Sequence, residues 1–600
     1  MSNTTKKTSS SQFIPEKINS RILVITFLSS LILGTIGYKH YAHGGETVYI
    51  TNALYHAVQL FVLHAPHFGA PVPWTLEIAR WLAAASTGFV LYNTALHLLH
   101  NERMAYVLKR REKHVVVCGL GRRGMVVVEK LHASGIKLVA IDKNPEPDVV
   151  ERLNALHIPL ITGDAARKEI LKQARIEYAD RFFTFCPDDT INIEIALEAQ
   201  KIGNKTGSSR QCFIHINDAE LRNALQSNTN KKVSAKPTQV LHFIDAYEPE
   251  AISVLTEKLP LDHDGISPND SKQVHLIILG FGCMGRIIAV KAAQLGVFAN
   301  RKNLRISVID HKAELNRSSL LFHHPYIEEV ADIKFYHQEV LSLETRNQIE
   351  KWCSEPNTLV NVAVCFDNTT LAYDTVFNLL PLFNRKNVRV AVRINEPESF
   401  DFLLKGAKAE KDNNLTITTF GLERSFENLT SPLDNVIEKF AIDIHKAYVK
   451  MIHKENENTP EELEKKLESG ELNDWKNLSE DFRESNRQQA VHIGFKLRAS
   501  GYEMVDIHDP RPAIEIFPPK LLDNLAIMEH NRWVAERKVN NWKYGAKTDK
   551  SNRINANITD WDKLTDEIKE YDYVTVRRIP ELLKLIGMKM VEKQLKVLTY

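Results

Sequence analysis

Three glycines spaced Gly119-x-Gly121-x-x-Gly124 follow an apolar run and open an amphipathic stretch, and the next apolar run ends at Asp142. This spacing suits pyrophosphate, because the first glycine allows a tight turn, the second lets phosphate approach the backbone, and the third lets helix and strand pack closely. Amide groups at the start of the expected helix attract phosphate. The Asp142 carboxylate can accept from both ribose hydroxyls and repels a 2′-phosphate, which favours NAD(H) or another adenine nucleotide over NADP.

The same pattern recurs further along the chain. A second loop carries Gly280, Gly282 and Gly285, and the apolar run after it ends at Asp310. Later segments repeat as well: the run around Asp188 is echoed around Asp367, and CFIHIN (212–217) is echoed by VAVRIN (390–395). Repeated strand–glycine–helix units predict two doubly wound α/β domains, at 113–260 and 272–430, separated by the turn-rich linker 261–272.

The predicted cofactor-binding residues lie in both copies. They are Gly119, Gly121, Arg122, Gly124, Asp142 and Lys143 in the first, and Gly280, Gly282, Gly285 and Asp310 in the second. A Rossmann-like domain that has lost its ligand would carry the same pattern, so that interpretation stays open.

The first hundred residues predict a membrane module. The uncharged run 22–38 is long enough to cross a bilayer, and 81–99 is a second candidate. Lysines and arginines flank both runs on their outer sides, which predicts that both flanks are cytoplasmic. The apolar part of the intervening segment is too short to span, so it reads as a re-entrant or interfacial helix. A cleaved signal peptide is the alternative for the first run.

The expected order is therefore a tail (1–20) and a module (21–112) with helices at 21–40, 53–65 and 74–100. Helix, half-helix and helix in this order resemble the pore module of potassium channels. A T-x-G-[YF]-G filter is missing after the half-helix, where Leu63, His64 and Gly69 are the pore candidates. A plain membrane anchor with an amphipathic connector is the alternative.

The first glycine loop, Asp142 and a Gly163-Asp164-Ala165 turn before a helix resemble the NAD-binding subunit of Trk-type potassium uptake systems. The same fold is attached to channels as the regulator-of-potassium-conductance domain. The resemblance covers about 113–429 and implies that Asp164 helps to hold the adenosine end of the nucleotide. It also implies that tandem copies assemble as a tetrameric ring below a pore, and that the ligand shifts this ring between closed and open shapes. The second copy lacks a clear G-D-A, with Phe335-Tyr336-His337 in its place.

A further internal repeat follows, with copies at 431–510 and 515–600. His445 and His530, Trp475 and Trp561, and Gly501 and Gly587 keep nearly one offset, which is typical of a duplicated unit. The H-x-x-W, W-x-Y-G and W-x-x-L elements of the second copy resemble the repeat domain of ryanodine receptors. Aromatic faces and guanidinium groups here could form a second pocket for a nucleotide-like ligand. Its candidates are His445, Tyr448, Arg487, Arg532, Trp533, Trp542 and Tyr544. Packing of the small helical unit is the alternative role of the aromatics.

Composition excludes several other classes. Lys+Arg 77 against Asp+Glu 75 gives a net charge of +2, so no basic field indicates a nucleic-acid partner. The six cysteines form no C-x-x-C pair, which argues against a metal site or a disulfide framework. The sequence contains no H-E-x-x-H, G-x-S-x-G or Walker-type loop, so we expect no enzyme, with an NAD-dependent oxidoreductase as the third-ranked interpretation.

The predicted fold class is a membrane α-helical module, tandem α/β Rossmann-like domains and small helical repeat domains. The predicted function is a ligand-gated cation channel subunit, with potassium as the ion and its tandem nucleotide-binding domains in the cytoplasm. The expected partners are further copies in a homotetramer, membrane lipid and a small nucleotide. The expected location is a cell inner or plasma membrane, crossed more than once, with both termini cytoplasmic. A non-conducting membrane-anchored nucleotide sensor that regulates a partner is the alternative.

Overall fold

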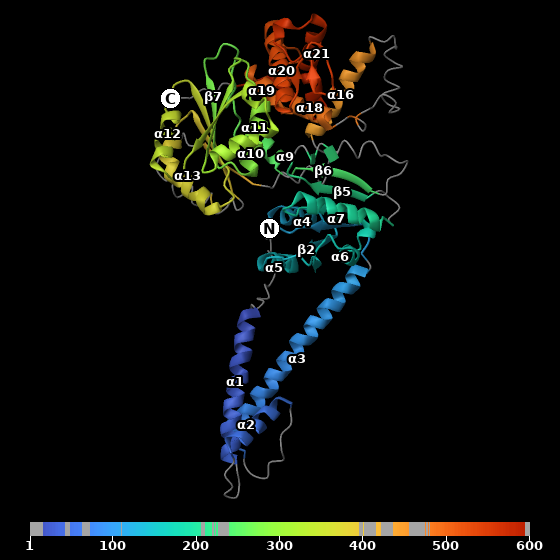
Figure 1. The fold of residues 1–600 in the computed structure, drawn as a ribbon, viewed down its shortest axis with the longest axis vertical. Coiled ribbons are helices and arrows are strands. Elements are labelled where there is room, and N and C mark those ends of the chain that lie inside the picture. Colours follow the sequence, from blue (N-terminus) through green and yellow to red (C-terminus); the bar gives the residue numbers. More distant parts are fainter. Residues whose placement is uncertain are drawn as a thin grey trace, which may run out of the picture. The chain divides into compact units, whose positions relative to one another are not determined.

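The computed structural model describes residues 16–41, 49–62, 72–109, 111–205, 210–218, 221–222, 224–225, 239–245, 247–394, 400, 416–421, 436–454, 475, 478 and 480–594. The chain forms two compact units, Met1–Arg111 and Glu112–Tyr600 (Figure 1).

The N-terminal unit consists of two long helices and a short one between them (Figure 1). Its elements are α1 (Glu16–Tyr41), α2 (Ile50–Gln59), the 3-10 turn η1 (Leu60–Val62) and α3 (Trp74–Lys109). Small residues let α1 approach α3 closely: a Cβ on Gly37 would lie 2.7 Å from Cβ of Leu76. The Ser30 hydroxyl donates to the backbone oxygen of Ala79 at 2.8 Å. Close packing and interhelical hydrogen bonds of this kind hold helices together in lipid.

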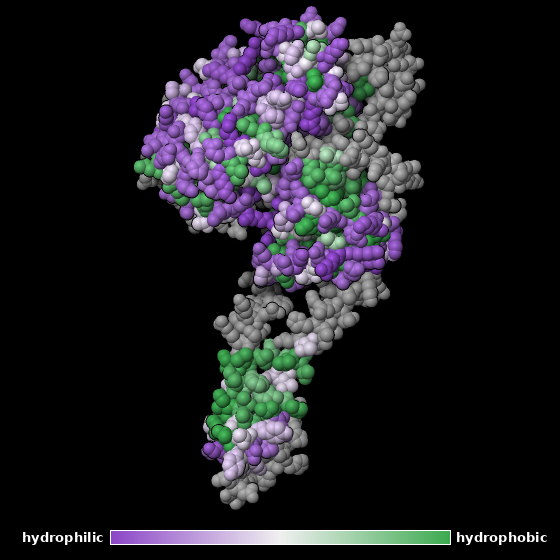
Figure 2. Space-filling view, viewed as in Figure 1, coloured by the Kyte–Doolittle hydropathy of each residue, from purple (hydrophilic) through white to green (hydrophobic). Residues whose placement is uncertain are grey.

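Large apolar side chains cover the outside of this unit, which is predominantly hydrophobic in Figure 2. Among the described residues, one helical segment, Leu23–Tyr41, is long and apolar enough to cross a bilayer. The second predicted span, 81–99, forms the middle of α3, and some of its side chains lie outside the description. The pore candidates Leu63, His64 and Gly69 also lie outside the described residues.

The C-terminal unit begins with a six-stranded parallel sheet in the order β3-β2-β1-β4-β5-β6. The strands are β1 (His114–Cys118), β2 (Leu138–Asp142), β3 (Leu160–Thr162), β4 (Ala179–Thr184), β5 (Arg210–His215) and β6 (Gln239–Ile244). The helices are α4 (Arg122–Ala133), α5 (Pro147–Ala155), α6 (Lys168–Gln173) and α7 (Asp189–Ile202), with the 3-10 turn η2 (Ile176–Tyr178). Every residue of β1 is buried, as expected for a parallel strand covered on both faces.

A second parallel sheet has the order β12-β11-β10-β7-β8-β9, which is the same topology read from the other edge. Its strands are β7 (Gln273–Leu279), β8 (Leu304–Asp310), β9 (Ala331–His337), β10 (Thr358–Val364), β11 (Val388–Arg393) and β12 (Thr416–Phe420). Its helices are α10 (Cys283–Leu295), α11 (Ala313–His323), α12 (Leu343–Cys353) and α13 (Thr369–Phe383), with the 3-10 turn η4 (Ile327–Glu329). Two sheets of one topology confirm the predicted tandem Rossmann-like domains.

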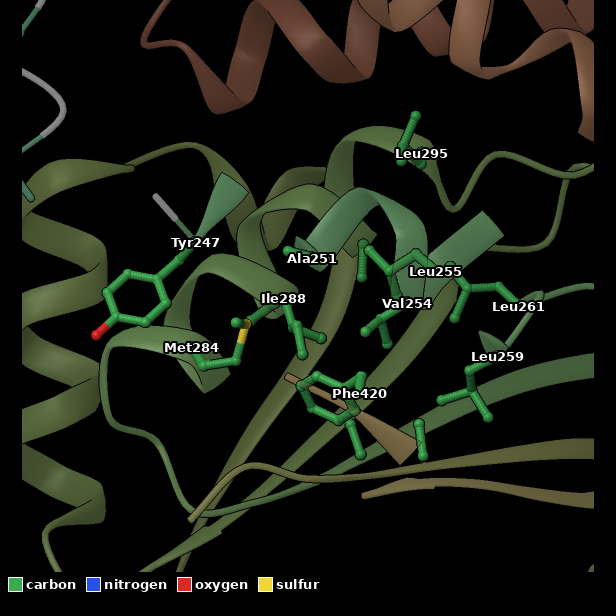
Figure 3. Close-up of a cluster of buried hydrophobic side chains, with 14 of the residues drawn as sticks. Tyr247, Ala251, Val254, Leu255, Leu259, Leu261, Met284, Ile288, Leu295 and Phe420 are labelled. Carbon is green, nitrogen blue, oxygen red and sulfur yellow. The ribbon is translucent and has the colours of Figure 1, made fainter. Parts of the chain in front are cut away.

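The connection between the two sheets is packed onto the second one. It consists of α9 (Glu248–Ser253) and the π-helical turn η3 (Val254–Lys258). Figure 3 shows Ala251 and Val254 from this connection beside Met284 and Ile288 of α10, with Phe420 of β12 completing the cluster. Because these side chains are buried, the connection adds apolar area to the core of the second domain rather than acting as a loose tether.

The last part of the unit contains two copies of one helical motif. The first has α16 (Val436–Lys454), α18 (Glu480–Val491), α19 (Ile493–Ala499) and β13 (Tyr502–Asp506). The second has α20 (Pro519–Val539), the short strands β14 (Lys543–Tyr544) and β15 (Ile554–Asn555), the 3-10 turn η7 (Trp561–Lys563), α21 (Asp566–Arg577), α22 (Ile579–Lys584) and β16 (Met588–Glu592).

Equivalent residues of the two copies occupy equivalent places. Gly501 and Gly587 precede β13 and β16 with φ of 75° and 73°, a conformation that favours glycine. β13 and β16 pair antiparallel, and Met504 faces its repeat equivalent Met590 in the register. The two copies are therefore joined by one small antiparallel sheet.

Candidate functional site

The first glycine loop joins β1 to α4 and has one function for each glycine. Gly119 has φ of 84°, and a Cβ there would lie 2.8 Å from backbone atoms of Phe185 and Cys186. A Cβ on Gly124 would lie 1.9 Å from the backbone oxygen of Gly119, so only glycine lets α4 start this close to the loop. Gly121 precedes the first residue of α4, and no atom lies within 4 Å of its Cβ position. The helix start is therefore open for an approaching anion.

Asp142 is held at the same loop by backbone donors. Its Oδ2 accepts from the amide of Leu120 at 2.6 Å, and its Oδ1 accepts from the amide of Asn144 at 2.9 Å. Burial first and the charge of Asp142 second raise the pKa of the neighbouring Cys186 thiol to about 11. That thiol therefore stays protonated near neutral pH.

Asp164 lies at the same loop and contacts Lys143, the residue after Asp142. Lys143 Nζ donates to its Oδ2 at 3.0 Å, and the amide of Ala166 donates to its Oδ1 at 3.1 Å. The hydrogen bond from Lys143 is the main reason why the pKa of Asp164 is lowered. The amide of Gly163 donates to the backbone oxygen of Asp142 at 2.8 Å, which ties the two carboxylates to adjacent strand ends. The structure thus brings together acceptors for ribose or adenine and donors for phosphate at one sheet edge.

Arg122, the first residue of α4, points to the second domain. Its Nη1 lies 3.2 Å from the backbone oxygen of Asp367 and 3.6 Å from Oδ1 of that residue. The same Oδ1 accepts from Arg393 at 2.7 Å. The Tyr247 ring lies 5.0 Å from the guanidinium of Arg123 and 5.5 Å from that of Arg393. We call Arg122, Arg123, Tyr247, Asp367 and Arg393 the interdomain bridge, which was not predicted from the sequence.

The second glycine loop repeats the backbone geometry of the first. Gly280 has φ of 88°, and a Cβ on Gly285 would lie 2.3 Å from the backbone oxygen of Gly280. Asp310 accepts from the amide of Phe281 at 2.8 Å, as Asp142 does from Leu120.

The second loop differs from the first in what faces its middle glycine. The nearest atom to the Cβ position of Gly282 is Oδ2 of Asp367, at 4.0 Å. A carboxylate at this place repels phosphate, whereas the corresponding place in the first loop is open. In the first copy the equivalent residue, Asp188, instead accepts from the amide of Thr190 at 2.7 Å and caps α7.

The candidates for a second pocket do not line one cavity. Trp533 and Trp542 enclose a side chain of this protein, since the Arg537 guanidinium lies 5.6 and 5.1 Å from their rings. Phe482 closes the same cage at 5.0 Å. Arg537 itself is buried, so the aromatic faces that spacing alone assigns to a ligand are in contact with an internal cation.

The remaining members of that set lie in separate surroundings. Arg487 pairs with Glu438 at 2.7 Å, and Arg532 pairs with Glu529 at 2.9 Å inside the repeat. The His445 ring lies 5.7 Å from Trp475, as His530 does from Trp561 at 5.8 Å. The two tyrosines stand apart from these contacts: Tyr448 packs against Tyr571 at 5.8 Å between ring centres, and Tyr544 is 61% exposed.

Metal ligation has no support in the part of the chain that the structure describes, where no three His, Cys, Asp or Glu side chains converge. Five of the six cysteines are buried or partly buried, and Cys283 is exposed.

Comparison with known protein families identifies two of the domains. Residues 115–234 match the TrkA-N domain, and residues 518–592 match the RyR domain. Both matches confirm the domain composition predicted from the sequence. The first repeat copy lies outside the RyR match and is related to the second by the shared motif described above.

Individual relatives align with the chain over part of their length. It is 28% identical over 127 residues to "Probable potassium channel protein 2" of Methanocaldococcus jannaschii, which is 21% of this chain and 37% of that protein. It is 34% identical over 96 residues to "Potassium channel protein 1" of the same organism, 16% of this chain and 28% of that one. A third relative, "Glutathione-regulated potassium-efflux system protein KefC" of Escherichia coli, is 28% identical over 122 residues, 20% of this chain and 19% of KefC. The chain therefore aligns with little more than a third of these relatives at most.

Solved structures similar to the chain include GsuK bound to ADP, with a TM-score of 0.37, 12% identity, and coverage of 70% of this chain and 98% of that chain. The GsuK channel bound to NAD has a TM-score of 0.33 and 12% identity, and covers 70% and 82% of the two chains.

Proposed function

We propose that this chain is the subunit of a nucleotide-gated cation channel that conducts potassium, with the first glycine loop as the regulatory site. The relatives named as potassium channel proteins and as a potassium-efflux system support potassium transport as the process. The apolar N-terminal helices support a membrane location. An assembly of four copies, with both termini cytoplasmic, is part of the proposal.

The observation that carries the proposal is the contrast between the two glycine loops. The first has an open helix start at Gly121 and a fixed carboxylate pair, Asp142 and Asp164. The second has the carboxylate of Asp367 facing Gly282. We therefore assign the nucleotide, NAD(H) or another adenine nucleotide, to the first copy alone.

The interdomain bridge supplies a physical route from ligand to domain arrangement. A pyrophosphate at the start of α4 offers Arg122 two oxygens for a forked, charge-assisted contact. In this structure, Arg122 forms an ion pair with Asp367 at 3.6 Å. Because both side chains are more than half exposed, this ion pair is weak. Phosphate thus competes well for Arg122, and release of Asp367 changes the contact between the two Rossmann-like domains.

The free energy required is modest. Moving a two-state gate from 1:99 to 99:1 takes about 5.5 kcal/mol of differential binding. Shared among four copies, this is about 1.4 kcal/mol for each site, within the usual range of allosteric coupling.

Calorimetry on the purified chain in nanodiscs tests the ligand assignment. We expect NAD+, NADH or ADP to bind with one site per chain, and Asp142→Asn to weaken that binding at least tenfold. Asp310→Asn is the matched control in the second copy and leaves the affinity unchanged. Flat titrations with all three nucleotides contradict the assignment.

A non-conducting, membrane-anchored nucleotide sensor is the second candidate, and the missing T-x-G-[YF]-G filter motif favours it. Substitutions within Leu63–Gly69 distinguish the two. They change ion flux through reconstituted protein if the segment lines a pore, and the sensor predicts no flux with or without them.

A further inference from the structure

A cavity of about 560 Å³ lies where three parts of the C-terminal unit meet. Its wall includes Phe243 from the first sheet, Arg286 from α10, Ile437 from α16, Gln488 from α18 and Arg553 from the loop between β14 and β15. The glycine-loop residues assigned to the nucleotide above do not line it. Its volume is within the usual range of small-molecule sites and far larger than a single ion needs.

Much of the charge on the wall of this cavity is already paired. The buried Lys291 forms ion pairs with Glu248 and with Glu484, the latter at 3.0 Å. Burial alone lowers the pKa of the Lys291 amine. The two carboxylates together have the larger effect, so the pKa is raised. Arg222 lies 3.5 Å from Glu248, and Arg487 lies 3.5 Å from Glu484. This network links the first domain, the second domain and the repeats, so these carboxylates are engaged before any ligand arrives.

Arg286 and Gln488 on the wall each have a buried polar atom without a hydrogen-bond partner among the described residues. Arg286 has no ion-pair partner there, and its buried Nε has no hydrogen-bond acceptor. Gln488 is 1% exposed, and its Nε2 donates to Gln294 at 2.8 Å and to Glu484 at 3.0 Å. Those two acceptors fix the direction of the amide, and the buried Oε1 of Gln488 is left without a donor. Gln488 is thus held in the wall by its two acceptors, and Arg286 is a wall cation without an ion-pair partner among the described residues.

We propose that this cavity binds a nucleoside phosphate, as an effector site separate from the glycine loops. The guanidinium fork of Arg286 matches two phosphate oxygens. The apolar side chains of Phe243, Ile252 and Ile437 provide a surface for a base. A ligand that contacts the first domain, the second domain and the repeats stabilises one arrangement of the three. Its binding is therefore coupled to any change in that arrangement.

The experiment uses the full chain in nanodiscs with Gly121→Ala, which we expect to weaken nucleotide binding at the first glycine loop. Isothermal titration is carried out with AMP, GMP, CMP and UMP and with the four matching nucleosides. We expect at least one monophosphate to bind with one site per chain and its nucleoside to bind at least tenfold more weakly. Adding Arg286→Gln weakens the binding at least tenfold, and adding Ile252→Trp abolishes it by filling the cavity. Arg317→Gln, at an exposed ion pair on α11, is the control and changes nothing.

Three outcomes overturn the proposal: none of the monophosphates binds the Gly121→Ala protein, binding persists unchanged in both the Arg286→Gln and Ile252→Trp proteins, or the nucleosides bind as tightly as the monophosphates. Ile252→Trp changes no charge, so it keeps the test decisive if Arg286→Gln perturbs folding. The readout is binding rather than flux, which separates this site from the proposed channel function.

Discussion

Alanine at two glycines of the first loop separates nucleotide binding from folding. Gly121→Ala adds a methyl group where no atom lies within 4 Å, in a backbone conformation with φ of −62° that alanine accepts. Gly124→Ala adds the same group 1.9 Å from the backbone oxygen of Gly119. The two variants differ by three positions and are chemically identical, so they form a matched pair.

The expected magnitudes follow from these distances. Relief of the 1.9 Å contact at Gly124 requires α4 to shift, and overpacking of this kind costs about 1–3 kcal/mol of stability. At Gly121 the loss of a glycine cap and the reduced freedom of the unfolded chain nearly offset each other, so the stability changes by less than about 1 kcal/mol. The added methyl group nevertheless occupies the approach of a pyrophosphate, and we expect at least a tenfold loss of affinity, about 1.4 kcal/mol.

Urea unfolding and nucleotide calorimetry on the same samples measure both quantities, with Gly282→Ala in the second loop as the control. The expected result is weak binding with normal stability for Gly121→Ala, reduced stability for Gly124→Ala, and normal binding for Gly282→Ala. Wild-type affinity in Gly121→Ala, or an equal loss in Gly282→Ala, refutes the assignment of the nucleotide to the first loop.

Three further predictions concern stability. Lys496→Met removes one of two cationic partners of the buried Glu529 carboxylate, the amine at 2.6 Å, and leaves Arg532 at 2.9 Å. We therefore expect the free energy of unfolding in urea to fall by about 1–3 kcal/mol, and an unchanged value argues against a buried ion pair. Burial raises the pKa of Asp572 in the folded protein to about 6. The folded protein therefore takes up a proton there as the pH falls below 6, and its free energy of unfolding increases. This stabilisation is lost as the pH rises, at about 1 kcal/mol per pH unit. Asp572→Asn should remove this dependence of the free energy of unfolding on pH. Parallel curves for the wild type and the variant contradict the prediction. Gly37→Val, with a Cβ 2.7 Å from α3, should lower the melting temperature in detergent, whereas Gly88→Val, with nothing within 4 Å, should not; equal effects exclude close helix packing at this position.

The glycine loops were predictable because their geometry permits few residue types. A positive φ at Gly119 and a helix start packed against its backbone oxygen both require glycine, and these requirements are local in sequence. Asp142 was predictable for the same reason, since it ends the adjacent strand. The contact between Arg122 and Asp367 was not, because the two residues are 245 positions apart and meet only after both domains have folded.

The surroundings of the aromatic residues in the repeats could not be predicted from the sequence. The sequence pattern assigned Trp533 and Trp542 to a possible ligand pocket, but a pattern does not state which side chain fills the space between them. Arg537 turned out to occupy the cage formed by Trp533 and Trp542, so the face is internal rather than open to a ligand. The cavity at Arg286 left no pattern in the sequence, because its wall is contributed by three segments that lie far apart along the chain.

Ion flux through liposomes that contain the purified chain shows whether nucleotide at the first glycine loop gates a pore. Rubidium or potassium uptake is measured with and without the nucleotide that calorimetry identifies, for the wild type and for Gly121→Ala. We expect nucleotide to change flux at least severalfold in the wild type and to have no effect in the variant. Flux that is the same with and without a bound nucleotide in the wild type contradicts this expectation.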